Sequence, residues 1–182
     1  MKKLLIIVIA LFGFGLVAGP ATATDLGIHG AYWNTDQADR TFGFGAKLRF
    51  SFVELRGTYF DDVTADVEPE SADFEIKAYP LEAGIVIQFL KNSMIRPYIG
   101  GGAGYYVLDT TVGDIDDEIG YYLVGGADIG SPGSRVAFSI EAIYRNIEGT
   151  VRGDFFQDLD LDEDVPLDLS GIGANAGVVF RF

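Results

Sequence analysis

The chain has 182 residues, of which 27 are acidic and 13 are basic, giving a formal net charge of −14. This length fits one domain, and the strong negative charge argues against a nucleic-acid partner. The chain contains no cysteine, which excludes disulfide bonds, thiol chemistry and cysteine-ligated metals.

The first segment is predicted to be a cleaved leader. Two lysines precede the apolar residues 4–17, and the small residues Ala21-Thr22-Ala23 follow. A charged start, an apolar run and an A-x-A site are typical of a secretory signal peptide. The apolar run is also shorter than the ~20 residues of a membrane-spanning helix. We therefore expect residues 1–23 to be a signal peptide and residues 24–182 to form the mature domain, with 11 basic residues remaining.

The mature chain alternates between apolar and mixed positions in eight segments, and a period of two indicates β-strands. The segments are Leu26–Asn34, Thr41–Phe50, Val53–Phe60, Phe74–Phe89, Ile95–Leu108, Ile119–Ile129, Arg135–Arg145 and Leu169–Phe182. Each apolar face is about nine residues long, close to the ~9–11 residues of a tilted membrane strand. The mature chain has no apolar run of helical-span length, so a membrane location would require a closed barrel.

The alternation in the second and third segments determines the length of the turn that connects them. Phe50 and Val53 both fall on the apolar, outward face, so a two-residue turn at Ser51-Phe52 fits best. This pairing places Arg49 opposite Glu54, and Lys47 opposite Arg56, on the inner face.

The fourth segment changes phase along its length. Its apolar residues are even-numbered up to Ala78 and odd-numbered from Leu81 onwards. We predict a β-bulge at Pro80, which would absorb the extra residue and the missing N–H group.

The fifth segment contains the glycine-rich run Gly100–Gly104. No helix follows this run, so it is not a phosphate-binding loop. We expect the inward glycines to leave room for large neighbours beside Tyr98 and Tyr106.

Short and long connections alternate without exception along the chain. The short ones are Ser51–Phe52, Leu90–Met94 and Gly130–Ser134, and the long ones are Asn34–Arg40, Asp61–Asp73, Asp109–Glu118 and Asn146–Asp168. Such alternation is typical of an antiparallel barrel with turns at one end and loops at the other.

Aromatic residues gather near both ends of the strands. Those at the loop end are Tyr32, Trp33, Phe42, Tyr59, Tyr105, Tyr121 and Tyr144, and those towards the turn end are Phe50, Phe89, Phe138, Phe180 and Phe182. Alternation alone is also compatible with a soluble lipocalin-like barrel. Two aromatic girdles and an almost uncharged outer face favour a membrane barrel instead.

The last segment ends the chain at Phe182 after alternating apolar residues, and it resembles the closing strand of bacterial outer-membrane β-barrels. The mature chain as a whole resembles small OmpA/OmpX-type barrels. The resemblance implies an all-β, eight-stranded antiparallel up-and-down transmembrane barrel in the outer membrane. It also implies contact with outer-membrane lipid and lipopolysaccharide, and recognition of Phe182 by the outer-membrane insertion machinery.

The lumen of an eight-stranded barrel is narrow enough to be filled by side chains. The polar residues predicted to face inward are Lys47, Arg49, Glu54, Arg56, Glu82, Gln88, Arg96, Asp128, Arg135, Glu141, Arg145 and Arg181. Charges of both signs in a narrow interior must pair, which predicts a structural salt-bridge core. A gated ion path or ligand chamber is the alternative interpretation.

His29 is the only histidine, and its parity points it inward with no serine nearby in sequence. A lipid-modifying hydrolase would need a nucleophile and a base that reach the lipid. We therefore assign no catalytic residue and no cofactor site.

The predicted loops are acidic, through Asp61, Asp62, Asp66, Glu68, Glu70, Asp73, Asp109, Asp114, Asp116, Asp117, Glu118, Asp154, Asp158, Asp160, Asp162, Glu163, Asp164 and Asp168. Oxygen-rich loops suit Ca²⁺ or Mg²⁺, which could bridge lipopolysaccharide phosphates. However, residues 158–162 lack the glycine and distal glutamate of an EF-hand, so we assign no metal site. The same alternation could extend the last two strands as a hairpin above the membrane.

These patterns favour a non-enzymatic outer-membrane barrel with a structural or surface-interaction role, carried by its acidic loops. A small-solute or hydrophobic-ligand channel is the alternative. A lipid-modifying enzyme is a third possibility.

Overall fold

A computed structural model describes residues 24–35, 40–65, 74–110, 117–151 and 165–182. The strands in these ranges are β1 (Thr24–Thr35), β2 (Thr41–Phe50), β3 (Val53–Ala65), β4 (Phe74–Gln88), β5 (Ile95–Thr110), β6 (Glu118–Ile129), β7 (Val136–Asn146), β8 (Glu148–Val151), β9 (Val165–Asp168) and β10 (Gly171–Arg181). The predicted signal peptide, residues 1–23, lies outside the described residues. None of the described segments forms a helix long and apolar enough to cross a membrane.

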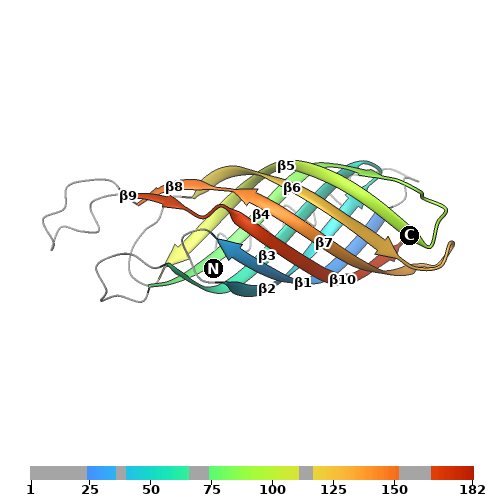
Figure 1. The fold of residues 1–182 in the computed structure, drawn as a ribbon, viewed down its shortest axis with the longest axis horizontal. Coiled ribbons are helices and arrows are strands. Elements are labelled where there is room, and N and C mark those ends of the chain that lie inside the picture. The colour runs from blue at the N-terminus through green and yellow to red at the C-terminus, as the bar shows by residue number, and fades with distance from the viewer. Residues whose placement is uncertain (1–23, 36–39, 66–73, 111–116, 152–164) are drawn as a thin grey trace, which may run out of the picture.

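Eight of the described strands close into an antiparallel barrel in the order β1-β10-β7-β6-β5-β4-β3-β2. The first and last of them, β1 and β10, pair from Asp25–Arg181 to Thr35–Gly171 and so close the sheet. The strands are tilted around the barrel, and the C-terminus lies at the turn end (Figure 1). The predicted eight-stranded up-and-down barrel is confirmed.

The turn between β2 and β3 has the predicted length and register. Phe50 pairs with Val53, Arg49 with Glu54, and Lys47 with Arg56. Ser51 adopts a φ of 57°, the left-handed backbone that two-residue hairpin turns require.

The predicted bulge at Pro80 is wrong. The β4–β5 ladder runs without a shift through Pro80–Tyr106, and the only register shift between β3 and β4 in the described pairs lies between Phe60 and Val63. Ala78 is 1% exposed and faces the lumen, so the side chains of β4 do not change phase there. The phase change in the sequence arises because Ala78 is apolar although it faces the lumen and not the lipid.

The final strand begins later than predicted, at Gly171, because a separate hairpin precedes it. The strands β8 and β9 pair with each other and not with the barrel. The Leu169 N–H donates to the Ile147 carbonyl at 3.0 Å, which continues this hairpin down to the barrel mouth. Figure 1 shows this hairpin projecting beyond the barrel, and the alternating residues 158–162 lie outside the described residues.

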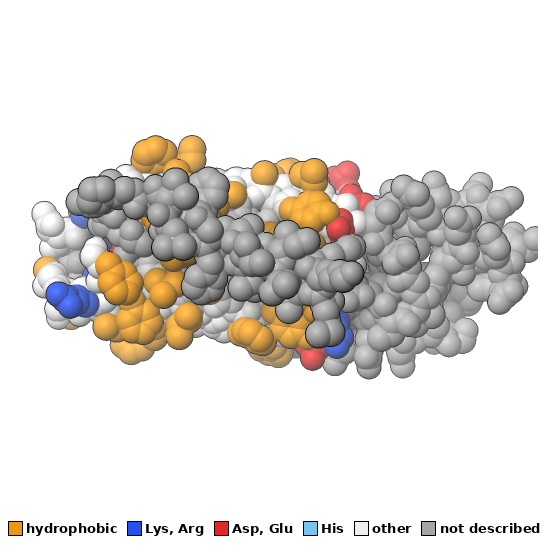
Figure 2. Space-filling model, turned by 180° about the vertical axis from the view of Figure 1, so that it is seen from behind, with side chains coloured by type: hydrophobic (Ala, Val, Ile, Leu, Met, Phe, Trp, Pro, Cys, Tyr) orange, Lys and Arg blue, Asp and Glu red, His pale blue; other side chains and the backbone are white. Residues whose placement is uncertain are grey.

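The outer wall of the barrel is apolar. Large exposed side chains on it include Phe42, Phe44, Ile99, Ile119, Leu123, Phe138, Ile140 and Ile172. Figure 2 shows hydrophobic side chains along the wall and charged side chains near its two ends. A continuous apolar wall of this kind is stable against hydrocarbon and would promote aggregation in water.

Candidate functional site

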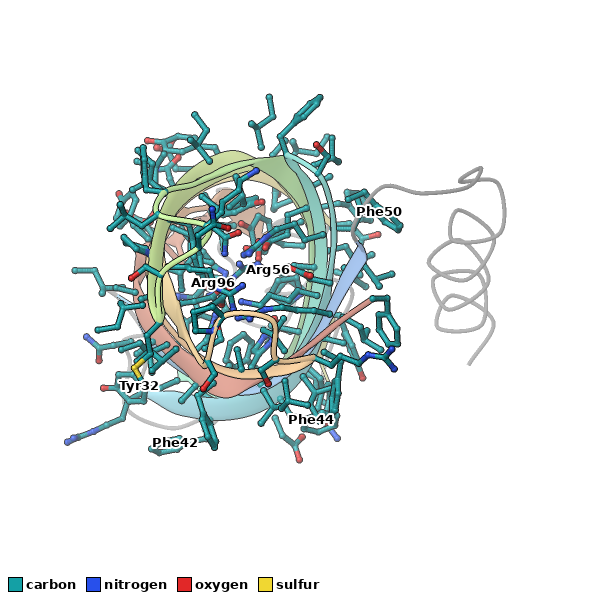
Figure 3. All side chains as sticks on the ribbon, turned by 90° about the vertical axis from the view of Figure 1, so that its right-hand side faces the viewer. Tyr32, Phe42, Phe44, Phe50, Arg56 and Arg96 are labelled. Atoms are coloured by element: carbon teal, nitrogen blue, oxygen red, sulfur yellow. The ribbon has the colours of Figure 1, made fainter. Side chains whose placement is uncertain are left out.

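The barrel interior brings charged side chains from most strands to one place. Arg56 and Arg96 point into the lumen, as seen from the turn end in Figure 3. Arg56 is 1% exposed, and Glu54, Asp128 and Arg145 are fully buried. Charges this deep require partners with good geometry.

Glu141 on β7 is the centre of the network. Its carboxylate accepts hydrogen bonds from both Nη atoms of Arg56 at 3.0 and 3.1 Å, and it pairs with the Lys47 ammonium. Tyr98 donates its hydroxyl to Oε1 at 2.6 Å, and Asn175 donates Nδ2 to Oε2 at 2.9 Å. A single carboxylate therefore joins β7 to β2, β3, β5 and β10.

From Arg56 the network continues towards the turn end. Arg56 Nη2 lies 2.6 Å from Glu54 Oε1, and Glu54 Oε2 lies 2.8 Å from Arg49 Nη2. Arg49 also reaches Asp128 at 3.2 Å, and Gln88 donates to the same Asp128 oxygen at 3.0 Å.

The network also continues towards the loop end through Glu82. Arg145 Nε donates to Glu82 Oε1 at 2.7 Å, and Arg56 Nε lies 3.8 Å from Glu82 Oε2. Tyr106 donates its hydroxyl to the same carboxylate at 3.2 Å. Arg145 also lies over the Trp33 ring, 5.4 Å from its centroid, where a cation–π interaction forms.

The described ion pairs of the lumen use four cations and four carboxylates, which balances their charge. The predicted salt-bridge core is therefore present. Arg135 precedes β7, which begins at Val136, and it is exposed, so it does not take part in this buried network. Arg96 is buried as predicted, but it has no carboxylate within 4.0 Å among the described residues.

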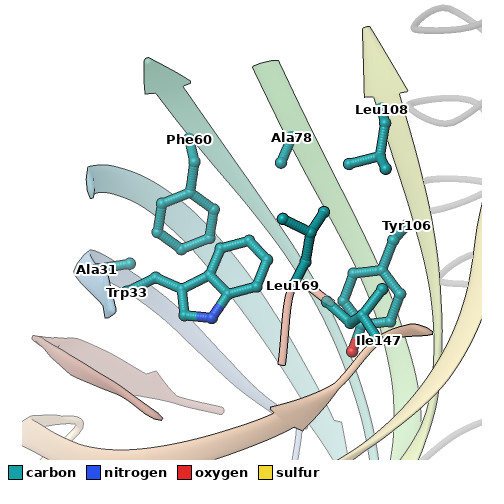
Figure 4. Close-up of a cluster of buried hydrophobic side chains, with 8 residues drawn as sticks. All are labelled: Ala31, Trp33, Phe60, Ala78, Tyr106, Leu108, Ile147 and Leu169. Carbon is teal, nitrogen blue, oxygen red and sulfur yellow. The ribbon is translucent and has the colours of Figure 1, made fainter. Parts of the chain in front are cut away.

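A second layer of the lumen, at the loop end, is apolar. We call it the apolar cap, and it consists of Ala31, Trp33, Phe60, Ala78, Tyr106, Leu108, Ile147 and Leu169 (Figure 4). The prediction that Trp33 belongs to the loop-end aromatic girdle is wrong, since Trp33 is fully buried against Phe60 with ring centroids 5.2 Å apart. Ile147 directly precedes β8 and Leu169 directly follows β9, so both residues join the apolar cap from the base of the hairpin.

The apolar cap was missed in the sequence, although parity could have revealed part of it. Phe60 is an even residue of β3, like the inward residues Glu54 and Arg56, and Leu108 has the parity of Tyr106. Ile147 and Leu169 gave no such signal because both lie outside the regular strands.

His29 faces the lumen as predicted and is 7% exposed. Neither ring nitrogen has a hydrogen-bond partner among the described residues, so His29 has no serine positioned for it to activate there. The glycines opposite it matter for its position, because a Cβ on Gly45 would lie 2.7 Å from His29 Nε2. The His29 ring therefore lies directly over the backbone of β2 at Gly45, where there is no side chain.

Most of the acidic loop residues lie outside the described residues, including Asp66, Glu68, Glu70, Asp73, Asp114, Asp116 and residues 154–164. Within the described part, no three acidic or histidine side chains are grouped to hold a metal ion. Asp168, on the projecting hairpin, accepts a hydrogen bond from the Ser170 N–H at 2.9 Å, and hydrogen bonds from Ser170 lower the pKa of this carboxyl.

The closed wall and filled lumen define an eight-stranded β-barrel of the small outer-membrane type. No known protein family matches the sequence, and no curated protein does. Among solved structures, the chain is similar to the outer membrane protein OprG from Pseudomonas aeruginosa, with a TM-score of 0.73 and 17% identity over 89% of this chain and 96% of that one. It is also similar to Neisserial surface protein A, with a TM-score of 0.55 and 15% identity over 88% and 96%. These likenesses confirm the fold.

Proposed function

We propose that this protein is a non-enzymatic, integral outer-membrane barrel that acts at the cell surface through its acidic loops. The filled lumen carries the proposal. The ion pairs around Glu141 occupy the turn-side layer and the apolar cap occupies the loop-side layer. With the interior used for stability, the loops and the β8–β9 hairpin are the parts available to partners.

The end of the chain supports the membrane assignment. Phe182 is 79% exposed at the turn end, and the neighbouring outward residues Phe180 and Phe138 are exposed as well. Aromatic side chains at the turn end of the barrel would lie at the membrane–water interface, where aromatic residues are enriched. We propose that the insertion machinery reads this terminal strand and that divalent cations, Ca²⁺ or Mg²⁺, bind at the acidic loops.

Conductance separates this proposal from a solute channel. Purified barrels reconstituted into planar bilayers should give no steady current above the lipid background, because buried side chains close both layers of the lumen. A reproducible single-channel step from protein that shows a heat-dependent gel shift would contradict the filled lumen and favour the channel.

The loops are tested by shortening them. A variant in which residues 111–116 and 152–164 are replaced by short glycine-serine linkers should still insert, because the barrel ladders lie outside these segments. It should fail to restore detergent and chelator resistance to cells that lack the protein, while a variant with linkers of the original length and charge restores it. Full restoration by the shortened variant would argue against a role for the loops.

A further inference from the structure

The turn end of the barrel carries an excess of positive charge, although the chain as a whole has a formal net charge of −14. The turns at this end, residues 51–52, 89–94 and 130–135, contain no acidic residue. The ion pairs of the lumen balance each other and leave out Arg96, Arg135, Arg181 and Asp25. We call the three arginines the arginine mouth.

Two of these cations, Arg135 and Arg181, lie directly opposite each other at the end of the β7–β10 ladder. The Arg181 N–H donates to the Arg135 carbonyl at 2.8 Å, one step beyond the pair of Val136 with Phe180. Like charges in this position destabilise a sheet. Arg181 Nε and Nη2 are buried without a hydrogen-bond partner in the part of the chain that the structure describes, and Nη1 reaches only the Ser134 carbonyl, at 3.5 Å. The Arg181 guanidinium therefore has donors to spare.

The third cation, Arg96, is more deeply buried. Its side chain points into the lumen in Figure 3 and is 8% exposed. Nε and Nη2 of Arg96 are buried and have no partner among the described residues. Asp128 lies opposite Arg96 in the β5–β6 ladder, but the two form no ion pair, and Asp128 Oδ2 already accepts from Arg49 and Gln88. A buried guanidinium with free donors is costly unless an acceptor reaches it.

The remaining carboxylate, Asp25, does not neutralise the arginine mouth. It is half-buried and lies between Arg181 on β10 and Arg49 on β2 in the strand register, without an ion pair to either. Arg96 is near enough for its charge to act on Asp25, which places both residues in the same part of the lumen. One carboxylate against three unpaired cations leaves the mouth positive, so it attracts anions.

We propose that the arginine mouth binds a phosphate group, with Arg96 and Arg181 donating to its oxygens and Arg135 adding positive charge at the rim. A tetrahedral phosphate has enough oxygens to accept from two guanidinium groups, and the planar guanidinium fork matches two oxygens at once. The same chemistry has two sources, a free phosphate from the aqueous side or the head group of an anionic phospholipid at the membrane interface. The inference goes beyond the proposed function and needs only the barrel fold, not the acidic loops.

Three variants test the site, each with the same change in net charge. Arg96→Gln and Arg181→Gln each remove one donor, whereas Lys91→Gln removes an exposed lysine from the β4–β5 turn. The heat-dependent gel shift checks that each protein is folded. Titration calorimetry in an uncharged detergent, at constant ionic strength, measures the binding of inorganic phosphate. A second series measures binding of phosphatidylglycerol in mixed micelles, with phosphatidylcholine as the reference of zero net charge.

The original chain should bind one phosphate group per barrel. Arg96→Gln and Arg181→Gln should each weaken binding at least about tenfold, the loss of a charge-assisted hydrogen bond, and Lys91→Gln by less than about twofold. Saturation by inorganic phosphate assigns the free anion, and saturation by phosphatidylglycerol alone assigns the lipid head group. Saturation by neither, or an equal loss in Lys91→Gln and the arginine variants, would overturn the proposal. If Arg96→Gln does not fold, Arg181→Gln, at a less buried position, decides the outcome. None of these results bears on the acidic loops.

Discussion

Replacing Glu141 with glutamine is expected to destabilise the barrel by about 3–5 kcal/mol, the usual cost of removing one partner of a buried ion pair. The substitution keeps the shape of the side chain but leaves Lys47 without its carboxylate and Arg56 with one carboxylate fewer. Both cations are buried, so water cannot compensate. Equilibrium unfolding in detergent micelles, followed by the fluorescence of the only tryptophan, Trp33, measures the change.

Two companion variants make the Glu141 result specific. Glu148→Gln changes an exposed carboxylate on β8 and should alter the stability by less than about 0.5 kcal/mol. The double variant Lys47→Met with Glu141→Gln should recover part of the loss, because the cation left alone is removed as well. A cost below about 1 kcal/mol for Glu141→Gln alone would show that the network is not a stabilising core.

The second large effect on folding is expected from a substitution on the outer, lipid-facing side of the barrel wall. Leu123 is an exposed outward residue in the middle of β6, and Leu123→Arg should oppose folding into phospholipid vesicles by about 2–4 kcal/mol. The cost arises because a charge at the centre of the bilayer loses its hydration. The folded fraction is read from the heat-dependent shift on a detergent gel.

Ile119→Arg provides the depth control for Leu123→Arg. Ile119 also faces outward on β6, but it lies at the loop end, where the same charge should cost about 0–1 kcal/mol. In a water-soluble barrel both arginines would be tolerated alike, since both positions are exposed. Equal folded fractions for the two variants would therefore contradict a lipid-facing wall.

The sequence was sufficient for the eight barrel strands, for most of their inward and outward faces and for the pairing of β2 with β3. A period of two assigns each residue to a face, and the two-residue turn at Ser51-Phe52 then aligns Arg49 with Glu54 and Lys47 with Arg56. Contacts across the barrel could not be predicted in the same way. Lys47 meets Glu141 from 94 positions away because closure and strand tilt bring β2 and β7 together across the lumen.

The errors at Pro80 and Trp33 share one physical cause. Alternation tells which residues share a face, but the rule that apolar means lipid-facing fails where the lumen itself is apolar. Ala78 was therefore turned outward and a bulge was placed at Pro80 to accommodate it, and Trp33 was assigned to the aromatic girdle. Both residues belong to the apolar cap, and two of its other members, Ile147 and Leu169, lie outside the regular strands.

The requirement for an amphiphile tests the central claim most directly. Residues 24–182 are refolded from denaturant in plain buffer, in detergent micelles and in phospholipid vesicles, and each sample is analysed by sedimentation and by gel migration before and after heating. We expect a heat-sensitive, monodisperse barrel only in micelles and vesicles, and aggregation in plain buffer, because the exposed wall is apolar. A folded, monodisperse chain in plain buffer would contradict this account.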